Sequence, residues 1–118
     1  SYIPFQGIAL DNQNKALSQK TIGLKLSLLY NSSTGTLVYA ERHTSTTDNF
    51  GLFQLNIGEG TALTSTFSAI DWSKSNYYVK VEMDLLGGTN YTVNTVTKLG
   101  YAPFALASHF FCKGESPP

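Results

Sequence analysis

The residue types that most often perform catalysis are few in this chain, and their spacing predicts none of the common reactions. Its 2 histidines, His43 and His109, are far apart in the sequence, and its 1 cysteine is Cys112. A catalytic zinc ion needs three protein ligands, and a nucleophilic serine needs a histidine beside it. We therefore interpret His43 as a solvent-facing or rim residue of a strand, and we predict no metal site and no cofactor.

Acidic residues are the next candidates for chemistry. Glu82 and Asp84 share one face of a predicted strand, and paired carboxylates catalyse glycoside hydrolysis when a deep cleft shifts the pKa of one of them. A small domain with short loops offers no such cleft, so we predict a solvent-facing polar surface and no enzyme activity. Asp11, Asp48 and Asp71 lie in predicted loops, where oxygens can bind calcium, but they lack a clustered Asp-x-Asp pattern, and we predict no calcium site.

Aromatic and amide side chains point to binding instead of catalysis. Tyr78 is out of phase with the buried positions of its strand, so its ring is the best candidate for stacking on a sugar. Trp72 is a second candidate, although burial of this large ring as a plug at one end of the domain is the competing interpretation. Asn31 and Asn90 each begin an Asn-x-Ser/Thr triplet in a predicted loop, where a glycosylation site would lie.

Composition limits the partners. The chain has 118 residues with 8 basic and 8 acidic side chains, and its net charge is zero. Nucleic-acid binding needs a clustered excess of Lys and Arg, and a membrane-spanning helix needs about 20 consecutive apolar residues. Neither partner is therefore predicted. The length suits one domain with a core of its own.

The elements that would position these side chains are strands, because apolar residues recur at every second position. Residues 22–30 place Ile22, Leu24 and Leu26 on one face, and residues 77–85 alternate in the same way. Further strands are predicted over residues 2–10, 37–47, 53–57 and 91–99. Six or seven strands with one polar face each predict an all-β fold in which two sheets pack face to face.

Turn residues separate the predicted strands. Asn and Asp bond to nearby backbone and tolerate positive φ, as Gly does. These residues are concentrated at positions 11–15, 31–35, 48–51 and 87–90. In one of these turns we expect Gly51 to free the backbone and Phe53 to point inwards. Residues 58–75 break the alternation, so we predict a crossover loop with a short helical turn near 67–72.

The C-terminal part differs from the rest of the chain. We predict a β-sandwich domain over residues 1–103 and an extended or helical segment over residues 104–118. Cys112 cannot form an internal disulfide, and an unpaired thiol, an intermolecular link and a lipid attachment remain as alternatives. The exposed apolar residues of this segment that would join the chain to a partner are Phe104, Leu106, Phe110 and Phe111.

Several short motifs in a fixed order resemble those of one known family. The motifs are residues 5–11 (FQGIALD), 21–28 (TIGLKLSL), 35–41 (GTLVYAE), 47–53 (TDNFGLF), 57–60 (IGEG), 70–72 (IDW), 87–91 (GGTNY) and 99–106 (LGYAPFAL). Together they resemble the N-terminal module of Bacteroidetes-type secreted surface proteins, in which the module follows a signal peptide and precedes collagen-like, coiled-coil or tail-fibre-like regions. The resemblance implies an extracellular immunoglobulin-like or prealbumin-like sandwich, and it carries no catalytic residues.

Two functions remain open. The chain begins with Ser1, so we expect a secreted or cell-surface protein from which a signal peptide has been removed. We predict a non-enzymatic structural or adhesion module that assembles with other copies of itself or with downstream fibrous regions. The alternative is a carbohydrate-binding module that holds surface glycans with exposed rings. A flat row of such rings would favour the alternative, whereas buried rings would oppose it. The available rings are Tyr2, Tyr39, Trp72, Tyr77, Tyr78 and Tyr91.

Overall fold

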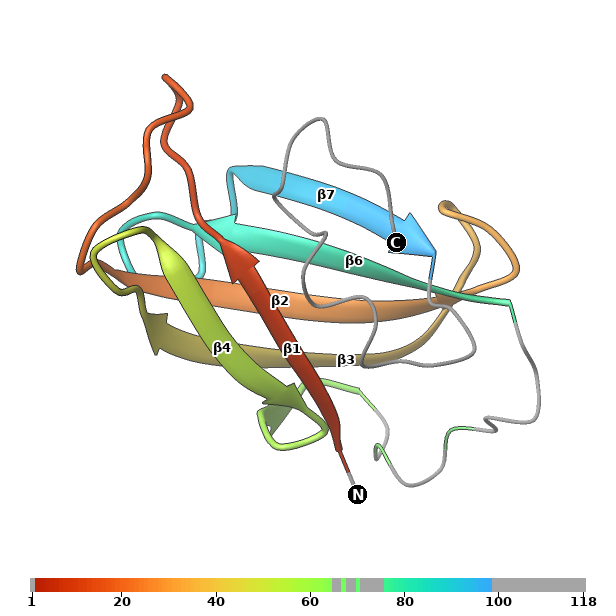
Figure 1. The fold of residues 1–118 in the computed structure, drawn as a ribbon. Helices are drawn as coiled ribbons and strands as arrows, with labels where there is room; N and C mark the ends of the chain where they lie inside the picture. The colour runs from red at the N-terminus through yellow and green to blue at the C-terminus, as the bar shows by residue number, and fades with distance from the viewer. Residues whose placement is uncertain (1, 65–66, 68–69, 71–75, 99–118) are drawn as a thin grey trace.

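The computed structural model describes residues 2–64, 67, 70 and 76–98, and the elements of this part of the chain are strands joined by turns (Figure 1). The described strands are β1 (Ile3–Ile8), β2 (Thr21–Tyr30), β3 (Thr36–Thr46), β4 (Leu52–Ile57), β5 (Thr61–Ala62), β6 (Tyr77–Asp84) and β7 (Val93–Lys98). Each strand predicted from the alternation is present, with its ends shifted by a few residues. Residues 104–118, the predicted assembly segment, lie outside the described residues.

Two antiparallel sheets make up the fold. β1 pairs with β4, and the larger sheet has the order β5-β3-β2-β6-β7, which places β2 at its centre. The chain passes between the two sheets after β1, after β3 and after β4. In Figure 1, β1 and β4 cross the face of the larger sheet. The predicted all-β sandwich of about seven strands is therefore confirmed.

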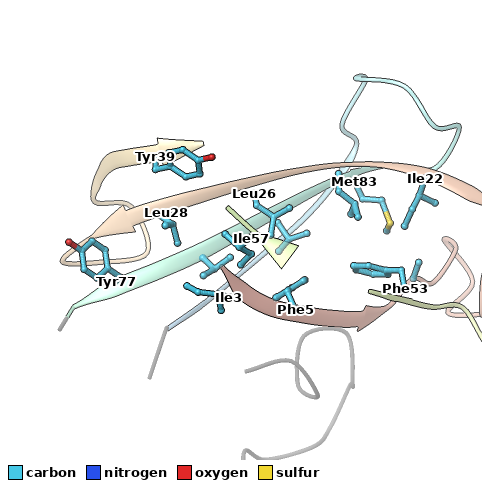
Figure 2. Close-up of a cluster of buried hydrophobic side chains, with 14 residues drawn as sticks. Ile3, Phe5, Ile22, Leu26, Leu28, Tyr39, Phe53, Ile57, Tyr77 and Met83 are labelled. Atoms are coloured by element: carbon cyan, nitrogen blue, oxygen red, sulfur yellow. The ribbon is translucent and has the colours of Figure 1, made fainter. Parts of the chain in front are cut away.

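The core lies between the two sheets, where the period-two alternation predicts it. Burial of an aliphatic or aromatic side chain stabilises the fold by about 1.5–3 kcal/mol, so the apolar face of each strand turns towards the other sheet. Figure 2 shows Ile3, Phe5 and Phe53 of the smaller sheet directed at the larger one. The core residues that the larger sheet contributes include Ile22, Leu24, Leu26 and Leu28 of β2, and Tyr77, Val79, Val81 and Met83 of β6.

The segment predicted as a crossover loop contains one further strand. Thr61 and Ala62 form β5 because they pair with Arg42 and Glu41 of β3. Two residues are too few to produce an alternation, so this edge strand has no pattern in the sequence. It adds backbone hydrogen bonding to the edge of β3, next to the candidate site described below.

The predicted helical turn near 67–72 is described at only two positions. The Ile70 N–H donates a hydrogen bond to the Phe67 carbonyl oxygen at 3.2 Å, which is the spacing of a single tight turn. Both side chains pack against the core. Trp72 lies outside the described residues, so its predicted role as a plug or a sugar platform stays a prediction.

Candidate functional site

Three side chains with polar groups point from β3 into the sandwich. Tyr39, Glu41 and His43 alternate along the strand, and their cross-strand partners on β2 are core leucines. Glu41 is 0% exposed, and the side chain of His43 is 11% exposed. Of the two positions predicted for His43, solvent-facing or rim, the solvent-facing one is wrong, because the alternation that buries Tyr39 turns His43 inwards as well.

The Glu41 carboxylate is surrounded by hydrogen-bond donors. Its Oε1 accepts a bond from the Tyr39 hydroxyl at 2.6 Å, and its two oxygens accept from the Gly58 N–H at 2.9 and 3.0 Å. His43 Nε2 contacts Oε2. Burial alone would raise the pKa of Glu41, but the bonds from His43, Tyr39 and Gly58 hold it below its usual value. Burial, with the carboxylate beside it, raises the pKa of Tyr39. At neutral pH Glu41 is therefore ionised and Tyr39 is protonated.

Two glycines of the β4–β5 loop complete this arrangement. Gly58 has a φ of 108°, a backbone conformation that residues with a side chain rarely adopt. A Cβ atom at Gly60 would lie 2.5 Å from His43 Nε2 and 2.6 Å from the Arg42 carbonyl oxygen. Glycine is therefore needed at both positions for the loop backbone to approach Glu41 and His43. We call Tyr39, Glu41, His43 and Gly58 the Glu41 network.

The Glu41 network is suited to holding the sandwich together. A general base needs a lone pair directed at a substrate, whereas both oxygens of Glu41 accept bonds from protein donors. Among the residues that the structure describes, no group of three or more His, Cys, Asp or Glu side chains is placed to hold a metal ion. The chemistry that the network supports is thus the fixing of β3 against the β4–β5 loop.

Aspartates fix two of the loops in the same way. The Asp11 carboxylate accepts hydrogen bonds from the N–H groups two and four residues later, at 2.8 and 3.0 Å, and Asp48 does so at 2.8 and 3.0 Å. The hydrogen bond from the Lys15 N–H, followed by that from the Gln13 N–H, lowers the pKa of Asp11. These carboxylates, considered above as calcium ligands, stabilise their own turns. Asp71, the third such residue, lies outside the described part of the chain.

Asp84 anchors the β6–β7 loop from a buried position. It is 6% exposed, and it accepts bonds from the N–H groups of Leu86 at 2.9 Å and Asn90 at 3.0 Å. The bond from Leu86, followed by that from Asn90, holds the pKa of Asp84 below its usual value despite some burial. The solvent-facing position predicted for Asp84 is wrong, because the loop folds back over its carboxylate. Glu82, predicted beside it, is partly exposed.

The three anchored loops lie at one end of the sandwich, at the left in Figure 1. The strand ends meet there, since Thr46 pairs with Thr21 and Asp84 pairs with Gly23. Two loops carry exposed apolar side chains: Phe50 is 77% exposed and Leu86 is 94% exposed. We call these two residues, with the loops that carry them, the loop end.

A groove with a volume of about 300 Å³ lies between β3 and the β6–β7 loop. Alternation directs Arg42 and Thr44 to the outer face of the larger sheet, away from Glu41. Burial raises the pKa of Tyr91 while the Arg42 charge acts in the opposite direction, so the two side chains are close enough to interact. The residues that line this outer groove are Arg42, His43, Thr44, Thr61, Gly87, Gly88, Thr89 and Tyr91.

The predicted sugar-binding rings that the structure describes do not form one exposed row. Tyr39 and Tyr77 are buried in the core, and Tyr78 is half-buried on the outer face of β6, opposite Leu29 of β2. Tyr91 lines a groove, and the sequence offered it as one of several rings without distinguishing it. The structure thus separates core rings from the ring at the outer groove.

The two predicted glycosylation positions are exposed. Asn31 lies at the start of the β2–β3 turn with a φ of 83°, and Asn90 lies in the β6–β7 loop. Both are therefore accessible, and their modification stays a prediction.

Comparison with known proteins gives one match. A family model described as "Domain of unknown function (DUF8740)" matches residues 4–98, a range that begins inside β1 and ends with β7. No curated protein and no solved structure matches the chain. In the part of the chain that the structure describes, no helix combines the length and apolar character needed to cross a membrane.

Proposed function

The chain belongs to the DUF8740 family, and we propose that it acts as a non-enzymatic structural or adhesion module of a secreted protein or surface appendage. The observation that carries this proposal is the loop end, where anchored loops expose Phe50 and Leu86. Loops that are already fixed lose little conformational freedom on binding, and exposed large apolar side chains favour protein contacts. The proposed partner is a second copy of the chain.

The ionisable groups support a non-catalytic role. The carboxylates of Asp11, Glu41, Asp48 and Asp84 each accept hydrogen bonds from backbone N–H groups. Such bonds fix loop geometry. The extracellular location is proposed from the sequence, whose order of motifs resembles that of secreted surface modules and in which only 14% of residues are charged.

The test is the mass of the full chain in solution, measured by light scattering over a range of concentrations. We expect the wild type to associate as its concentration rises. The F50S/L86S variant should reach the same degree of association only at a concentration about tenfold higher, because a few hot-spot side chains dominate the binding energy of a contact. The matched control is L37S/L63S, which removes two apolar side chains that are 48% and 44% exposed away from the loop end.

Two results would contradict the proposed contact. The first is an association that survives F50S/L86S or is weakened equally by L37S/L63S. The second is a wild-type chain that remains monomeric at every concentration. The segment 104–118, with Phe104, Leu106, Phe110 and Phe111, stays as the other predicted joint, and its removal from the full chain distinguishes the two.

Carbohydrate binding is the second candidate function, and the outer groove favours it. Ligand sites combine an apolar surface with a few convergent polar groups in a volume of at least about 300 Å³. The outer groove has a half-buried ring, Tyr91, together with the hydroxyl groups of Thr44 and Thr61. Tyr91 therefore takes the place of Tyr78 and Trp72 as the first ring to test.

A further inference from the structure

We propose that the outer groove binds a sugar unit that carries a carboxylate, as in an acidic polysaccharide, with Arg42 holding the carboxylate and Tyr91 covering the sugar ring. The inference names a ligand class for the second candidate function and rests on it. Three observations support it: the charge at the floor of the groove, the fixed position of its wall, and the polar groups of its lining.

The charge at the floor of the groove favours an anion. Arg42 is exposed, and its cross-strand neighbours are Lys25 on β2 and Thr61 on β5. Like charges directly opposite each other in a sheet repel. Lys25 faces Glu82 on its other side, so Lys25 has an acidic cross-strand neighbour and Arg42 does not. A carboxylate that enters the groove would supply the missing negative charge.

The guanidinium group of Arg42 also has the geometry for this ligand. Its planar arrangement of N–H groups matches the two oxygens of a carboxylate and binds them through parallel hydrogen bonds. Among the described residues, Glu82 and Asp84 are the acidic groups whose charges act on Tyr91. Glu82 lies opposite Lys25, and both oxygens of Asp84 accept N–H groups of the β6–β7 loop. Neither of them is a cross-strand neighbour of Arg42.

The wall of the groove is fixed before any ligand arrives. Asp84 anchors the β6–β7 loop at Leu86 and Asn90. The same loop rests on β2, where a Cβ atom at Gly23 would collide with the carbonyl oxygen of Gly88. A site with a preformed wall avoids the entropy loss of ordering a loop on binding.

The remaining lining favours a sugar over an acidic peptide. The hydroxyl groups of Thr44, Thr61 and Thr89 each offer one donor and two acceptor positions, which suits a ligand with many hydroxyl groups. The half-buried ring of Tyr91 presents an apolar face of the kind that packs against the C–H groups of a sugar ring. A carboxylate on a peptide side chain would use Arg42 but leave these groups without partners.

The experiment is calorimetric titration of the full chain with three ligands: a galacturonic acid trimer, the matched neutral galactose trimer and an acetylated glutamate trimer. We expect the galacturonic acid trimer to bind at least about tenfold more tightly than either of the others, the ratio that one charge-assisted hydrogen bond provides. R42A should remove this preference, and Y91A should weaken binding of both sugars. K80A removes a cation from the same sheet face outside the groove, so it should preserve the binding of both sugars and the preference for the acidic one.

Each other outcome overturns a defined part of the inference. Equal binding of the two sugars would overturn the role of Arg42 while leaving carbohydrate binding intact. Binding of the glutamate trimer as tightly as the acidic sugar would overturn the choice of a sugar. A preference that R42A retains would place the site elsewhere. Failure of both sugars to bind would contradict the inference and the second candidate function together. Thermal unfolding of R42A, Y91A and K80A is the control for folding. If all three unfold at the temperature of the wild type, their differences in titration reflect binding and not loss of structure.

Discussion

The Glu41 carboxylate fixes the inner face of β3. Burying a charge is unfavourable unless donors surround it, and Tyr39, His43 and Gly58 provide these donors. If the carboxylate is removed, the donors are left buried without an acceptor, and each unsatisfied group lowers stability further. Glu41 therefore contributes to stability by accepting these hydrogen bonds as much as by its own charge.

We expect Glu41→Gln to lower the free energy of unfolding by about 2–4 kcal/mol. The amide has the size of the carboxylate, but it keeps only one acceptor oxygen, so its NH₂ group faces either His43 or the Tyr39 hydroxyl and cannot accept the bond from that donor. Urea denaturation of the full chain measures the change. Glu59→Gln is the matched control, since Glu59 is exposed in the same loop, and it should change stability by no more than about 0.5 kcal/mol. Equal effects of the two substitutions would argue against a structural role for the Glu41 network.

The sequence contains part of the information about this network. Alternation alone places Tyr39, Glu41 and His43 on one face of a strand, and a buried Tyr39 implies that the other two also turn inwards. A donor from another part of the chain, the Gly58 N–H, makes a buried carboxylate possible. That contact joins residues 17 positions apart, and no local pattern predicts it.

At the scale of the elements, the β6–β7 loop shapes the outer face of the larger sheet. It lies over the start of β2, where Gly23 and Gly88 are in close approach, and its wall completes the outer groove. Gly23 is buried although it belongs to the polar face of β2. A side chain at this position would push directly against backbone, which cannot move aside as a flexible side chain can.

Gly23→Ala should therefore displace the β6–β7 loop and lower the free energy of unfolding by about 1–3 kcal/mol, the usual effect of overpacking. The same variant should lose any ligand that binds in the outer groove. Ser27→Ala changes another buried position on the same face of β2 and serves as the control, with an effect below about 1 kcal/mol. Stability is measured by urea denaturation, and a Gly23→Ala chain as stable as Ser27→Ala would contradict the close approach.

The strands could be predicted and the loop packing could not, for a physical reason. The long apolar series of β2 and β6 has a period of two, and hydrophobic burial follows that period directly. The sequence does not predict β5, because two residues carry no period, and it does not predict the burial of Asp84, which comes from residues 86–90 folding back. Burial imposed by a loop depends on where that loop packs, which the strand pattern does not contain.

At the scale of the whole molecule, several carboxylates stabilise the fold only when ionised. Hydrogen bonds from Lys15 and Gln13 lower the pKa of Asp11, and the bond from Leu86 leads those that lower the pKa of Asp84. The pKa of Glu41 is lowered as well. In the unfolded chain these groups bind protons at the ordinary values near 4, so the unfolded state takes up protons first as the pH falls.

The free energy of unfolding should therefore decrease from about pH 5 towards pH 3. Urea denaturation at several pH values measures this loss. Asp84→Asn removes one contribution, so the stability difference between this variant and the wild type should be larger at pH 7 than at pH 3. Glu82→Gln is the control, because Glu82 lies two residues before Asp84 on β6. Its free energy of unfolding should change with pH as that of the wild type does. A difference for Asp84→Asn that is independent of pH would contradict the anchoring role of the carboxylate.

Glu41 and Arg42 are adjacent in the sequence, yet one faces the core and the other the outer groove. If β3 were misaligned by a single residue, every side chain would change sides, and a guanidinium would meet the Gly58 N–H, for which it has no acceptor. The bonds to the buried carboxylate therefore favour the native alignment of β3 over one that is shifted by a residue. In the native alignment Arg42 lies on the opposite face of β3, so the same register that gives Glu41 its donors also places Arg42 in the outer groove.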